Sequence, residues 1–368
     1  MSVEISFILP TRDRPRELAR TLAALGALAP RAQAEVLVAD NASEPGAHAP
    51  RMLPNGWPVR VLRRTHNEGT AARNACAREA RGEWLVMLDD DSAPIDLGFL
   101  PAIREAHART AAIAAEILLP SGLHEQGGLP EVFVGCGAAI RRAAFLASGG
   151  YDAAFGFYAE EYDLCARLLA AGHGVSFDAR FRVLHEKTQT NRDMGLVLGR
   201  LVRNNGWVLA RYAPDALRDE AIAACIARYR AIAMKERALD GFAHGLAELE
   251  ATVACQPRTP LRDELWRRFT GEHAAREGLA RAAEAIEGRD VAIIGRGKGA
   301  EIVESLCIEL GARITDEGCA STLVIGTLSP GPLLDARTHH APDGRPVIAP
   351  WEPTRLRPLE GARPRAMA

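Results

Sequence analysis

The stretch ISFILPTRDRPRELARTLAALGALAPRAQAEVLVAD, residues 5–40, decides the fold expected at the start of this chain. The runs Glu4–Leu9 and Glu35–Ala39 have the β-rich composition of buried strands. Between them, leucines recur at helical spacing, at Leu18, Leu22 and Leu25. The stretch therefore predicts a strand, a helix and a second strand, which is the repeating unit of an α/β sheet.

The same alternation continues to about residue 190. Pro15 suits the first turn of the predicted helix, and Thr11 or Asp13 can cap it. Two further strand candidates, Val59–Leu62 and Glu83–Leu88, follow along the chain. We therefore expect an α/β sheet covered by helices in this part of the chain.

The composition of the chain excludes several classes of protein. Its 368 residues suffice for two or three domains, so a small disulfide scaffold is excluded. The 45 Lys and Arg nearly balance the 47 Asp and Glu, so we expect no nucleic-acid partner. The seven cysteines are scattered without a C-x-x-C pair, which predicts reduced thiols and neither disulfides nor a structural zinc site.

The sequence favours a location in the cytoplasm. Its first residues lack the pattern of a secretory signal, and it has no run of about 18 apolar residues. We expect neither export nor a transmembrane segment. Peripheral attachment to the inner face of the membrane stays compatible with the sequence, because a helix bearing Lys and Arg can lie on a bilayer surface.

Changes in composition divide the rest of the chain. An Ala-, Arg-, Glu- and Leu-rich region predicts about three helices, broken at Ala213–Asp215 and at Gln256–Pro257. These helices can shape an acceptor cleft, form a homo-oligomer or rest on a membrane. The predicted units are 1–191 (α/β), 192–288 (helical), 289–352 (a second, small α/β module) and 353–368 (a tail).

The small module begins with DVAIIGRGKGAEIVESLCIELGARIT, which predicts a strand, a glycine-rich turn, a helix and a strand. The segments STLVIG and RPVIAP are further strand candidates. The G-x-G-x-G turn departs from the dinucleotide-binding G-x-G-x-x-G, although Asp316 lies near where a ribose-binding acid would sit. We interpret the module as a Rossmann-like structural or regulatory addition; a nicotinamide-dependent oxidoreductase is the alternative.

The segment WLVMLDDDSAP, residues 84–94, is the most informative about chemistry. An apolar strand that ends in Asp89, Asp90 and Asp91 places three like charges at the carboxyl edge of a sheet, where α/β sheets bind ligands. Their repulsion costs stability unless a cation or another positively charged partner compensates it. A hard divalent metal that also holds a diphosphate explains the cluster. A solvated turn is the alternative.

Two more segments point to the same edge. Asp40 ends the second predicted strand, where a carboxylate can accept hydrogen bonds from a base or a ribose. Gly69 stands at a predicted helix start and Arg73 one turn into that helix, and free N–H groups beside an arginine suit a phosphate. A simple turn at Asp40 and a surface position for Arg73 are the alternatives.

Six blocks of sequence occur in an order that resembles the family 2 glycosyltransferases, over about residues 3–190. They are ISFILPTRDRP, VLVADNAS, NEGTAARNACARE, WLVMLDDD, VGCGAAIRRAAFLASGGYDAAFGFYAEEYDLCARL and VLHEKT. The resemblance implies the GT-A fold and an inverting, metal-dependent transfer of a hexosyl or related sugar. It implies a UDP- or dTDP-sugar donor, a divalent cation (Mn2+ or Mg2+) and a sugar-bearing or lipid-linked acceptor. A catalytically inactive nucleotide-sugar-binding protein is the alternative.

The resemblance also assigns roles on the donor side. Asp91, the last acid of the D-x-D motif, is the expected metal ligand. His185 matches a histidine that reaches the metal or the diphosphate in related enzymes; a hydrogen-bonded histidine at a strand end is the alternative. The expected nucleotide-binding residues are Thr11 and Asp13 in the first loop, Asp40 as the base-recognising acid, Arg73, Asp89 and Asp90.

The segment YAEEYDLCARLLAAG carries the acids expected on the acceptor side. At the start of an amphipathic helix, acids are favoured by the helix dipole alone. The family has mostly Asp as the general base; here Glu161 stands in that place, with Glu160 as the second candidate. Asp163 is assigned to the helix start or the acceptor side. Gly135 and Gly137, after the predicted strand EVFV, leave room for a sugar or a diphosphate; a β-bulge or a tight turn is the alternative.

Overall fold

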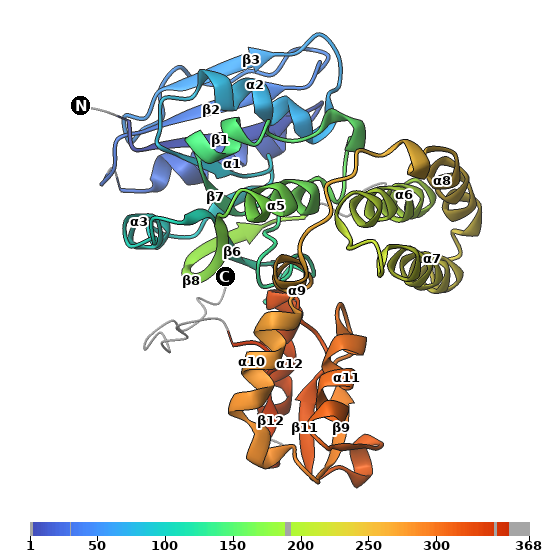
Figure 1. Ribbon diagram of the computed structural model, residues 1–368. Coiled ribbons are helices and arrows are strands. Elements are labelled where there is room, and N and C mark those ends of the chain that lie inside the picture. The colour runs from blue at the N-terminus through green and yellow to red at the C-terminus, as the bar shows by residue number, and fades with distance from the viewer. Residues whose placement is uncertain (1–2, 30, 188–192, 342–343, 353–368) are drawn as a thin grey trace.

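The computed structural model describes residues 3–29, 31–187, 193–341 and 344–352. Its largest unit is an eight-stranded sheet with the strand order β3-β2-β1-β4-β7-β6-β8-β5 (Figure 1). The strands are β1 (Ile5–Thr11), β2 (Ala34–Asp40), β3 (Val59–Arg63), β4 (Trp84–Met87), β5 (Ser92–Pro94), β6 (Thr110–Leu118), β7 (Ala138–Arg141) and β8 (Gly174–His185). The four strands expected near the N-terminus are confirmed.

Parallel pairing sets one edge of this sheet. β1 pairs in parallel with β2 and with β4, and β2 pairs in parallel with β3. The register places Thr11 opposite Asp40, and the N–H of Leu88 donates to Ile8 O at 3.0 Å just after β4. β7 runs antiparallel to both β4 and β6. The carboxyl ends of β1, β2 and β4 therefore meet at one edge, where the predicted donor-side residues follow them.

Helices cover both faces of the sheet. They are α1 (Pro15–Ala27), α2 (Ala72–Glu79), α3 (Phe99–Arg104), α4 (Arg142–Ala147) and α5 (Glu160–Ala170), with short 3₁₀-helices at Gly69–Ala71 and Ala153–Phe155. Successive residues of a strand point to opposite faces. Phe7 packs in one apolar cluster with Leu18 of α1 and Phe99 of α3, whereas Ile8 packs in another with Cys76 of α2 and Leu164 of α5.

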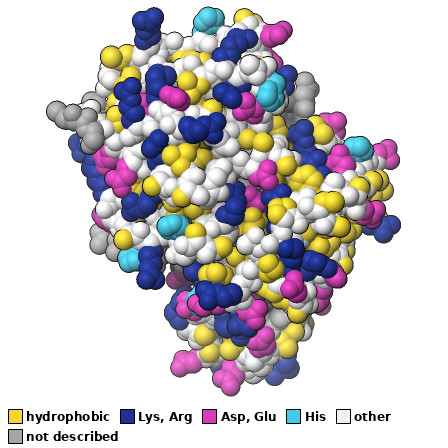
Figure 2. Space-filling view, turned by 45° about the horizontal axis from the view of Figure 1, so that its top comes forward, with side chains coloured by type: hydrophobic (Ala, Val, Ile, Leu, Met, Phe, Trp, Pro, Cys, Tyr) yellow, Lys and Arg dark blue, Asp and Glu magenta, His cyan; other side chains and the backbone are white. Residues whose placement is uncertain are grey.

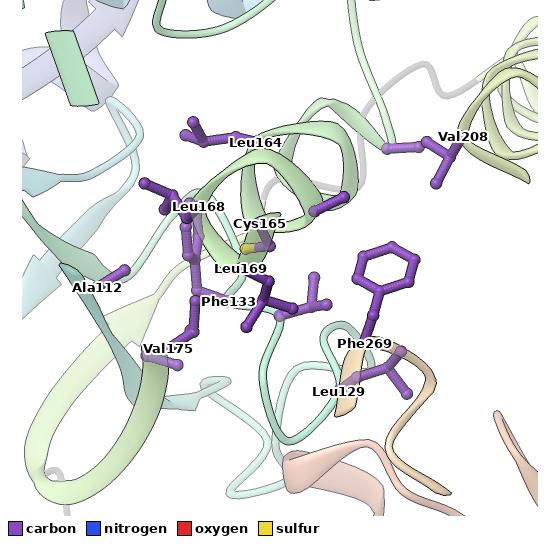
Figure 3. Packing of buried hydrophobic residues seen from close by; sticks show 14 of the residues in the cluster. Ala112, Leu129, Phe133, Leu164, Cys165, Leu168, Leu169, Val175, Val208 and Phe269 are labelled. Carbon is purple, nitrogen blue, oxygen red and sulfur yellow. The ribbon is translucent and has the colours of Figure 1, made fainter. Parts of the chain in front are cut away.

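Apolar packing fixes the position of α5. Its Leu164, Leu168 and Leu169 are buried, as their helical spacing predicts. They share a cluster with Ala112 of β6 and Val175 of β8 (Figure 3). Each fully buried leucine contributes roughly 1.5–3 kcal/mol relative to an exposed one. The first turn of α5, which carries Glu160 and Glu161, is therefore held firmly against the sheet.

The expected cap of α1 is wrong. The helix starts after Arg14 with no side-chain cap. Thr11 Oγ1 instead donates to Asp90 Oδ2 at 2.7 Å, and Asp13 Oδ1 accepts from the N–H of Glu44 at 2.8 Å. The two side chains thus bind neighbouring loops at the carboxyl edge of the sheet and not the first turn of α1.

The expected strand at 131–134, EVFV, is also wrong; the segment is a loop. Val132 and Phe133 are each 1% exposed, and Leu129 and Val132 exchange backbone hydrogen bonds that close a tight loop. A buried loop and a buried strand share the same composition, so the apolar run alone does not separate them. Gly135 consequently lies in the turn between this loop and β7.

Residues 193–288 form five α-helices where about three were expected. They are α6 (Met194–Tyr212), α7 (Arg218–Lys235), α8 (Leu239–Thr252), α9 (Asp263–Thr270) and α10 (Glu272–Arg281), with 3₁₀-helices at Val253–Cys255 and Ala283–Ala285. The breaks at 213–215 and 256–257 are confirmed. Arg237 and Gly271 lie in the two additional breaks, with left-handed φ angles of 55° and 82°. Arginine is uncommon at positive φ, so the sequence did not indicate the break at Arg237.

The described residues after 288 form a second sheet, β10-β9-β11-β12, in which all pairs are parallel. Its elements are β9 (Asp290–Ile294), α11 (Ala300–Glu309), β10 (Arg313–Ile314), β11 (Thr322–Ile325), α12 (Pro330–His340) and β12 (Val347–Ile348), with a 3₁₀-helix at Glu317–Cys319. The expected strands are confirmed.

The glycine-rich turn of this module packs on the module's own chain. The N–H of Leu328 donates to Lys298 O at 2.9 Å, and a Cβ on Gly299 would lie 2.7 Å from Leu328 Cδ1. The N–H of Gly297 donates to Gly326 O at 2.7 Å. A pyrophosphate-binding turn keeps its N–H groups open to the ligand, so these contacts favour a structural role over a dinucleotide site.

The small module docks on the large sheet. Ser329 Oγ donates to Gly128 O at 3.1 Å, and Trp351 packs edge-on against Phe177 of β8 with 5.7 Å between ring centroids. One apolar cluster runs from the face of the large sheet through α9 to α11. The module is therefore part of the same packed body rather than a loosely tethered unit.

His124 adds an ionic contact to this docking. Its Nδ1 lies 2.6 Å from Asp335 Oδ1 on α12, and its Nε2 lies 3.0 Å from Glu116 Oε1 on β6. Burial alone would lower the pKa of His124, but hydrogen bonds to the two carboxylates raise it above its ordinary value of 6.5. The charged histidine thus bridges the large sheet and the module.

We expect His124 to make the stability of the protein depend on pH. A raised pKa in the folded state gives stability that is fully present below the unfolded pKa, about 6.5, and lost as pH rises through the folded pKa. Urea unfolding between pH 5 and 9 should show that His124→Gln costs about 1.5–3 kcal/mol at low pH and less at high pH. A cost independent of pH would contradict a charged His124.

Three chain-wide features complete the fold. All seven cysteines are free, as expected. Basic and acidic side chains are interspersed over the face drawn in Figure 2, in keeping with their nearly equal numbers. Among the described residues, no helix combines the length and the apolar character that crossing a bilayer requires.

Candidate active site

The acids that follow β4 are buried against an arginine. Asp90 and Asp91 are 3% and 6% exposed. Arg14 Nη1 lies 2.7 Å from Asp90 Oδ1, and its Nη2 lies 2.6 Å from Asp91 Oδ2. Burial raises the pKa of Asp90 to about 7, although the charge of Arg14 opposes that shift. Sequence reasoning missed Arg14, whose only signal was its place in the loop TRDRP.

The structure brings Asp91 and His185 together, as predicted. His185 ends β8, and its Nε2 lies 3.3 Å from Asp91 Oδ1. Its Nδ1 lies 2.9 Å from Glu125 Oε2 and 3.5 Å from Cys136 Sγ. Burial would lower the pKa of His185, but hydrogen bonds to these neighbours raise it to about 12. Burial would raise the pKa of Asp91, but His185 and Arg14 hold it well below its usual range.

The donor chemistry around His185 fits a hard divalent cation. Ligand atoms of Asp89, Cys136 and His185 all lie within 4.8 Å of one another. Burial raises the pKa of the Cys136 thiol to about 11, and metals bind the thiolate rather than the thiol. Carboxylate oxygens with an imidazole suit Mn2+. Of the two expected ligands, His185 belongs to this group, and Asp91 contacts it at 3.3 Å without being part of the group.

Arg73 of α2 connects the end of β4 to the turn at Gly135. Its Nη2 donates to Leu88 O at 3.0 Å and to Asp89 Oδ1, and it lies 3.5 Å from Gly135 O. The Arg73 side chain is 3% exposed, which excludes the alternative of a surface residue. Its guanidinium therefore places a fixed positive charge between the end of β4 and the turn at Gly135.

Buried polar atoms without a hydrogen-bond partner gather around Arg73. Among the described residues they include Arg73 Nε, Tyr151 Oη and Glu160 Oε2. Burial raises the pKa of both Tyr151 and Glu160, and the nearby Arg73 charge opposes each shift. Buried unpaired polar groups are rare in native proteins. Their concentration here supports a site for a polar ligand.

The two candidate bases differ in their surroundings. Glu161 Oε1 accepts from the N–H of Gly135 at 3.2 Å, whereas Glu160 is 4% exposed and leaves one oxygen unpaired. Burial raises the pKa of Glu161, and Asp89 adds to that rise. Burial, followed by the charge of Glu161, raises the pKa of Glu160 well above its usual value. Glu161 is the less enclosed of the pair.

Asn204 of α6 holds the backbone that leads into Glu160. It is fully buried, and its Nδ2 points at three carbonyl oxygens. They belong to Phe155, Phe157 and Tyr158, at 3.0, 2.8 and 2.7 Å. Tyr158 and Ala159 have φ angles of 73° and 65°, a conformation that costs about 1–3 kcal/mol for such residues. The sequence analysis did not identify Asn204. Its only indication in the sequence is that it is a polar residue within an amphipathic helix.

Asp40 holds the loop that follows β2. Its Oδ1 accepts from the N–H of Ser43 at 2.9 Å and its Oδ2 from the N–H of Ala47 at 3.0 Å. Burial would raise the pKa of Asp40, but these bonds lower it. The side chain is 1% exposed, so contact with a base requires this loop to move. The base-recognising role of Asp40 stays a prediction.

Two residues predicted on the acceptor side do not face the site. Asp163 does lie in the first turn of α5, but it is fully buried and cannot touch an acceptor here. Its carboxylate oxygens bind Arg167, Arg211 and Tyr212, at 2.6, 2.9 and 2.7 Å. A Cβ on Gly137 would lie 2.9 Å from Ile117 Cγ1, so Gly137 packs within the sheet. Only Gly135 lies against a candidate base.

Part of this chain is similar to known proteins. Residues 6–122 match the family described as glycosyl transferase family 2. The O-antigen biosynthesis protein RfbC of Myxococcus xanthus is 27% identical over 229 residues, which cover 51% of this chain and 18% of that protein. The match thus spans less than a fifth of the length of that curated relative.

Solved structures of glycosyltransferases are similar at low identity. The mannosyltransferase PcManGT from Pyrobaculum calidifontis, solved with GDP-Man and Mn2+, has a TM-score of 0.46 at 17% identity, covering 69% of this chain and 76% of its own. TarS from S. aureus, solved with UDP-GlcNAc, has a TM-score of 0.49 at 14% identity, covering 77% and 88%.

Residues 6–122 thus match glycosyl transferase family 2, in keeping with the order of the sequence blocks, and they lie within the eight-stranded α/β unit. The matched residues include the strand ends that carry Thr11, Asp40 and Asp89–Asp91.

Proposed function

We propose that this protein transfers a sugar from a UDP- or dTDP-sugar to an acceptor hydroxyl, with inversion at the anomeric carbon and with Mn2+ or Mg2+. The observation that carries the proposal is the position of two groups around Gly135–Cys136. Glu161 accepts from the N–H of Gly135, and Cys136 Sγ lies 3.5 Å from His185 Nδ1. A base on one side and a cation site on the other suit attack opposite the departing diphosphate.

On the donor side, Asp91 and His185 would hold the cation, which supplies positive charge to the departing diphosphate when bound. Arg73 and Arg14 add fixed positive charge at the same strand ends. Thr11 links the loop after β1 to Asp90 after β4, and Asp13 links the same loop to the one after β2, in keeping with the predicted nucleotide-binding role.

On the acceptor side, Glu161 takes the proton of the attacking hydroxyl. Its raised pKa brings it closer to neutral pH, where a general base works most efficiently. Gly135 contributes by its lack of a side chain, because a Cβ there would lie 2.9 Å from Glu161 Oε1. A panel of nucleotide sugars with Mn2+ or Mg2+, followed by nucleotide release, tests the proposal. No release with any donor would contradict it.

Asp91→Asn is expected to weaken the binding of UDP in the presence of Mn2+ by about 10²-fold or more. Loss of groups that only support metal ligands costs about 10- to 100-fold in metal affinity, and a direct ligand matters at least as much. Calorimetric titration of UDP with and without Mn2+ measures the effect.

Asp96→Asn is the matched control, because Asp96 follows β5 and pairs at the surface with Arg182. It should leave the affinity for UDP unchanged. If UDP binds wild-type protein equally well in excess chelator, the cation has no part in donor binding and the assignment of Asp91 is wrong.

A further inference from the structure

A carboxylate holds the donor-side histidine from the loop between β6 and β7. His185 Nδ1 lies 2.9 Å from Glu125 Oε2, and Lys187 Nζ lies 2.6 Å from Glu125 Oε1. The Glu125 side chain is 12% exposed. The sequence analysis did not identify Glu125, which no strand signal or motif marks. Both of its carboxylate oxygens are therefore bound at the carboxyl end of β8.

This contact determines which nitrogen of His185 carries a proton. The ion pair with Lys187 keeps Glu125 ionised, and a carboxylate accepts hydrogen bonds but donates none. Nδ1 is therefore the donor. Cys136 Sγ, 3.5 Å from the same nitrogen, is farther away and is a weaker acceptor. The other nitrogen, Nε2, faces Asp91 Oδ1 at 3.3 Å.

A histidine held in this way is suited to bind a cation through Nε2. Histidines that bind metals usually donate their other ring N–H to a carboxylate or a carbonyl oxygen, which fixes the orientation of the ring and makes the binding nitrogen more basic. Glu125 has the place of that partner for His185. Because Glu125 acts through His185, it is a positioning residue and not a catalytic one.

The small module packs directly on the loop that carries Glu125. His124 Nδ1 lies 2.6 Å from Asp335 Oδ1 of α12, and the N–H of His124 donates to Asp335 Oδ2 at 3.1 Å. A Cβ on Gly331 would lie 2.2 Å from Glu125 O, so the first turn of α12 contacts the backbone of Glu125 itself. The cavity left at this interface is about 20 Å³, which is room for about one water molecule.

The large sheet holds the same loop from the other side. The N–H of Glu125 donates to Ile117 O of β6 at 3.0 Å, and His124 Nε2 lies 3.0 Å from Glu116 Oε1. The backbone of Glu125 thus lies between β6 and α12, with contacts to both. The orientation of His185 therefore depends on a loop that the docked module keeps in place.

We propose that Glu125 is a positioning residue that aims Nε2 of His185 into the donor site, and that docking of the small module holds Glu125 there. This inference rests on the proposed donor-side role of His185. It gives the small module a task at the donor site, in addition to its packing on the sheet.

The first test is an NMR signal that requires no metal. Full-length protein with isotopically labelled histidine, in excess chelator, should show a His185 Nδ1–H proton that exchanges slowly with water. Its absence in His185→Gln assigns the signal. Glu125→Ala should remove it, and Asp335→Ala should speed its exchange. A wild-type protein without this signal, or a signal unchanged in Glu125→Ala, overturns the proposal.

The second test is the affinity for Mn2+, measured by the EPR signal of free Mn2+ during a titration of the full-length protein. Glu125→Ala should lower this affinity about 10- to 100-fold, the usual loss when the partner of a metal-binding histidine is removed. Glu125→Gln should lose less, because its amide oxygen can still accept from Nδ1–H. Equal affinities of Glu125→Ala and wild type contradict the positioning role.

Asp335→Ala tests the part of the small module, even if Glu125→Ala does not fold. It removes the contact of α12 with His124 and leaves Glu125 in the chain, and the affinity for Mn2+ should fall about 2- to 30-fold, the range typical of coupling through packed residues. Unchanged affinity in Asp335→Ala would show that the module does not hold Glu125.

Glu131→Gln is the matched control. Glu131 lies in the same loop between β6 and β7, and it pairs with Arg268 of α9 rather than with His185. This variant should lose an ion pair of the loop but keep the His185 signal and the affinity for Mn2+. If it loses as much affinity as Glu125→Ala, the effect is a general loosening of the loop and the positioning role is wrong.

UDP binding with Mn2+ separates this inference from the proposed function. If wild-type protein binds neither UDP nor Mn2+ but the His185 signal depends on Glu125 and Asp335, the proposed donor site fails and the positioning of His185 stands. If wild-type protein binds both and the signal does not depend on Glu125, the proposed function stands and the role of Glu125 is wrong.

Discussion

Replacing Glu161 with glutamine is expected to lower the rate of sugar transfer about 10²- to 10⁴-fold while donor binding stays near wild type. A positioned general base contributes an acceleration of that size, and glutamine keeps the shape of glutamate but cannot take a proton. The amide oxygen can still accept from the N–H of Gly135, which lies 3.2 Å from Glu161 Oε1. The local backbone should therefore be preserved.

Glu160→Gln is the matched variant. Glu160 is 4% exposed and borders the unpaired atoms of Arg73 and Tyr151 rather than the turn at Gly135. Its replacement should lower transfer less than that of Glu161. Steady-state rates with saturating donor, together with UDP affinity, make the comparison. If Glu160→Gln is inactive and Glu161→Gln is active, the general base is Glu160. If both variants are active, neither residue is the general base.

The strand ends were predictable because their signals are local. β1, β2 and β4 each combine a short apolar run with a polar residue at its end, and parallel pairing then brings those ends to one edge. Asp40 and the three acids after β4 follow from that rule, whereas the place of Thr11 in a nucleotide-binding loop came from the family resemblance. The motif order added Glu161 and His185, whose partners lie far away in sequence.

Contacts between distant segments were not predictable. Arg14 and Asp91 are 77 residues apart, and Lys298 and Tyr162 are 136 residues apart. Nothing in the local composition links such pairs. Asp163 and Glu161 illustrate the same limit at short range, since both are acids in the first turn of α5. Only the packing of α6 shows that Asp163 is buried while Glu161 faces the turn at Gly135.

Asp163→Asn is expected to destabilise the fold by about 3–5 kcal/mol, which is the usual cost of removing one charge from a buried ion pair. Asp163 is fully buried, and its carboxylate joins Arg167 of α5 to Arg211 and Tyr212 of α6. An amide of the same shape turns one acceptor oxygen into a donor that faces guanidinium N–H groups. A loss of this size is a large part of the roughly 5–15 kcal/mol that stabilises a typical domain.

Urea unfolding of Asp163→Asn and Asp215→Asn makes the comparison. Asp215 pairs with Arg258 at the surface and its side chain is 85% exposed, so its replacement should cost about 0–1 kcal/mol. Equal midpoints for the two variants would show that the buried network adds nothing. Because Asn204 of the same α6 holds the backbone before Glu160, loosening α6 should also lower transfer in Asp163→Asn. This decrease would occur while the protein is still folded, since α6 positions the base through the segment 155–158.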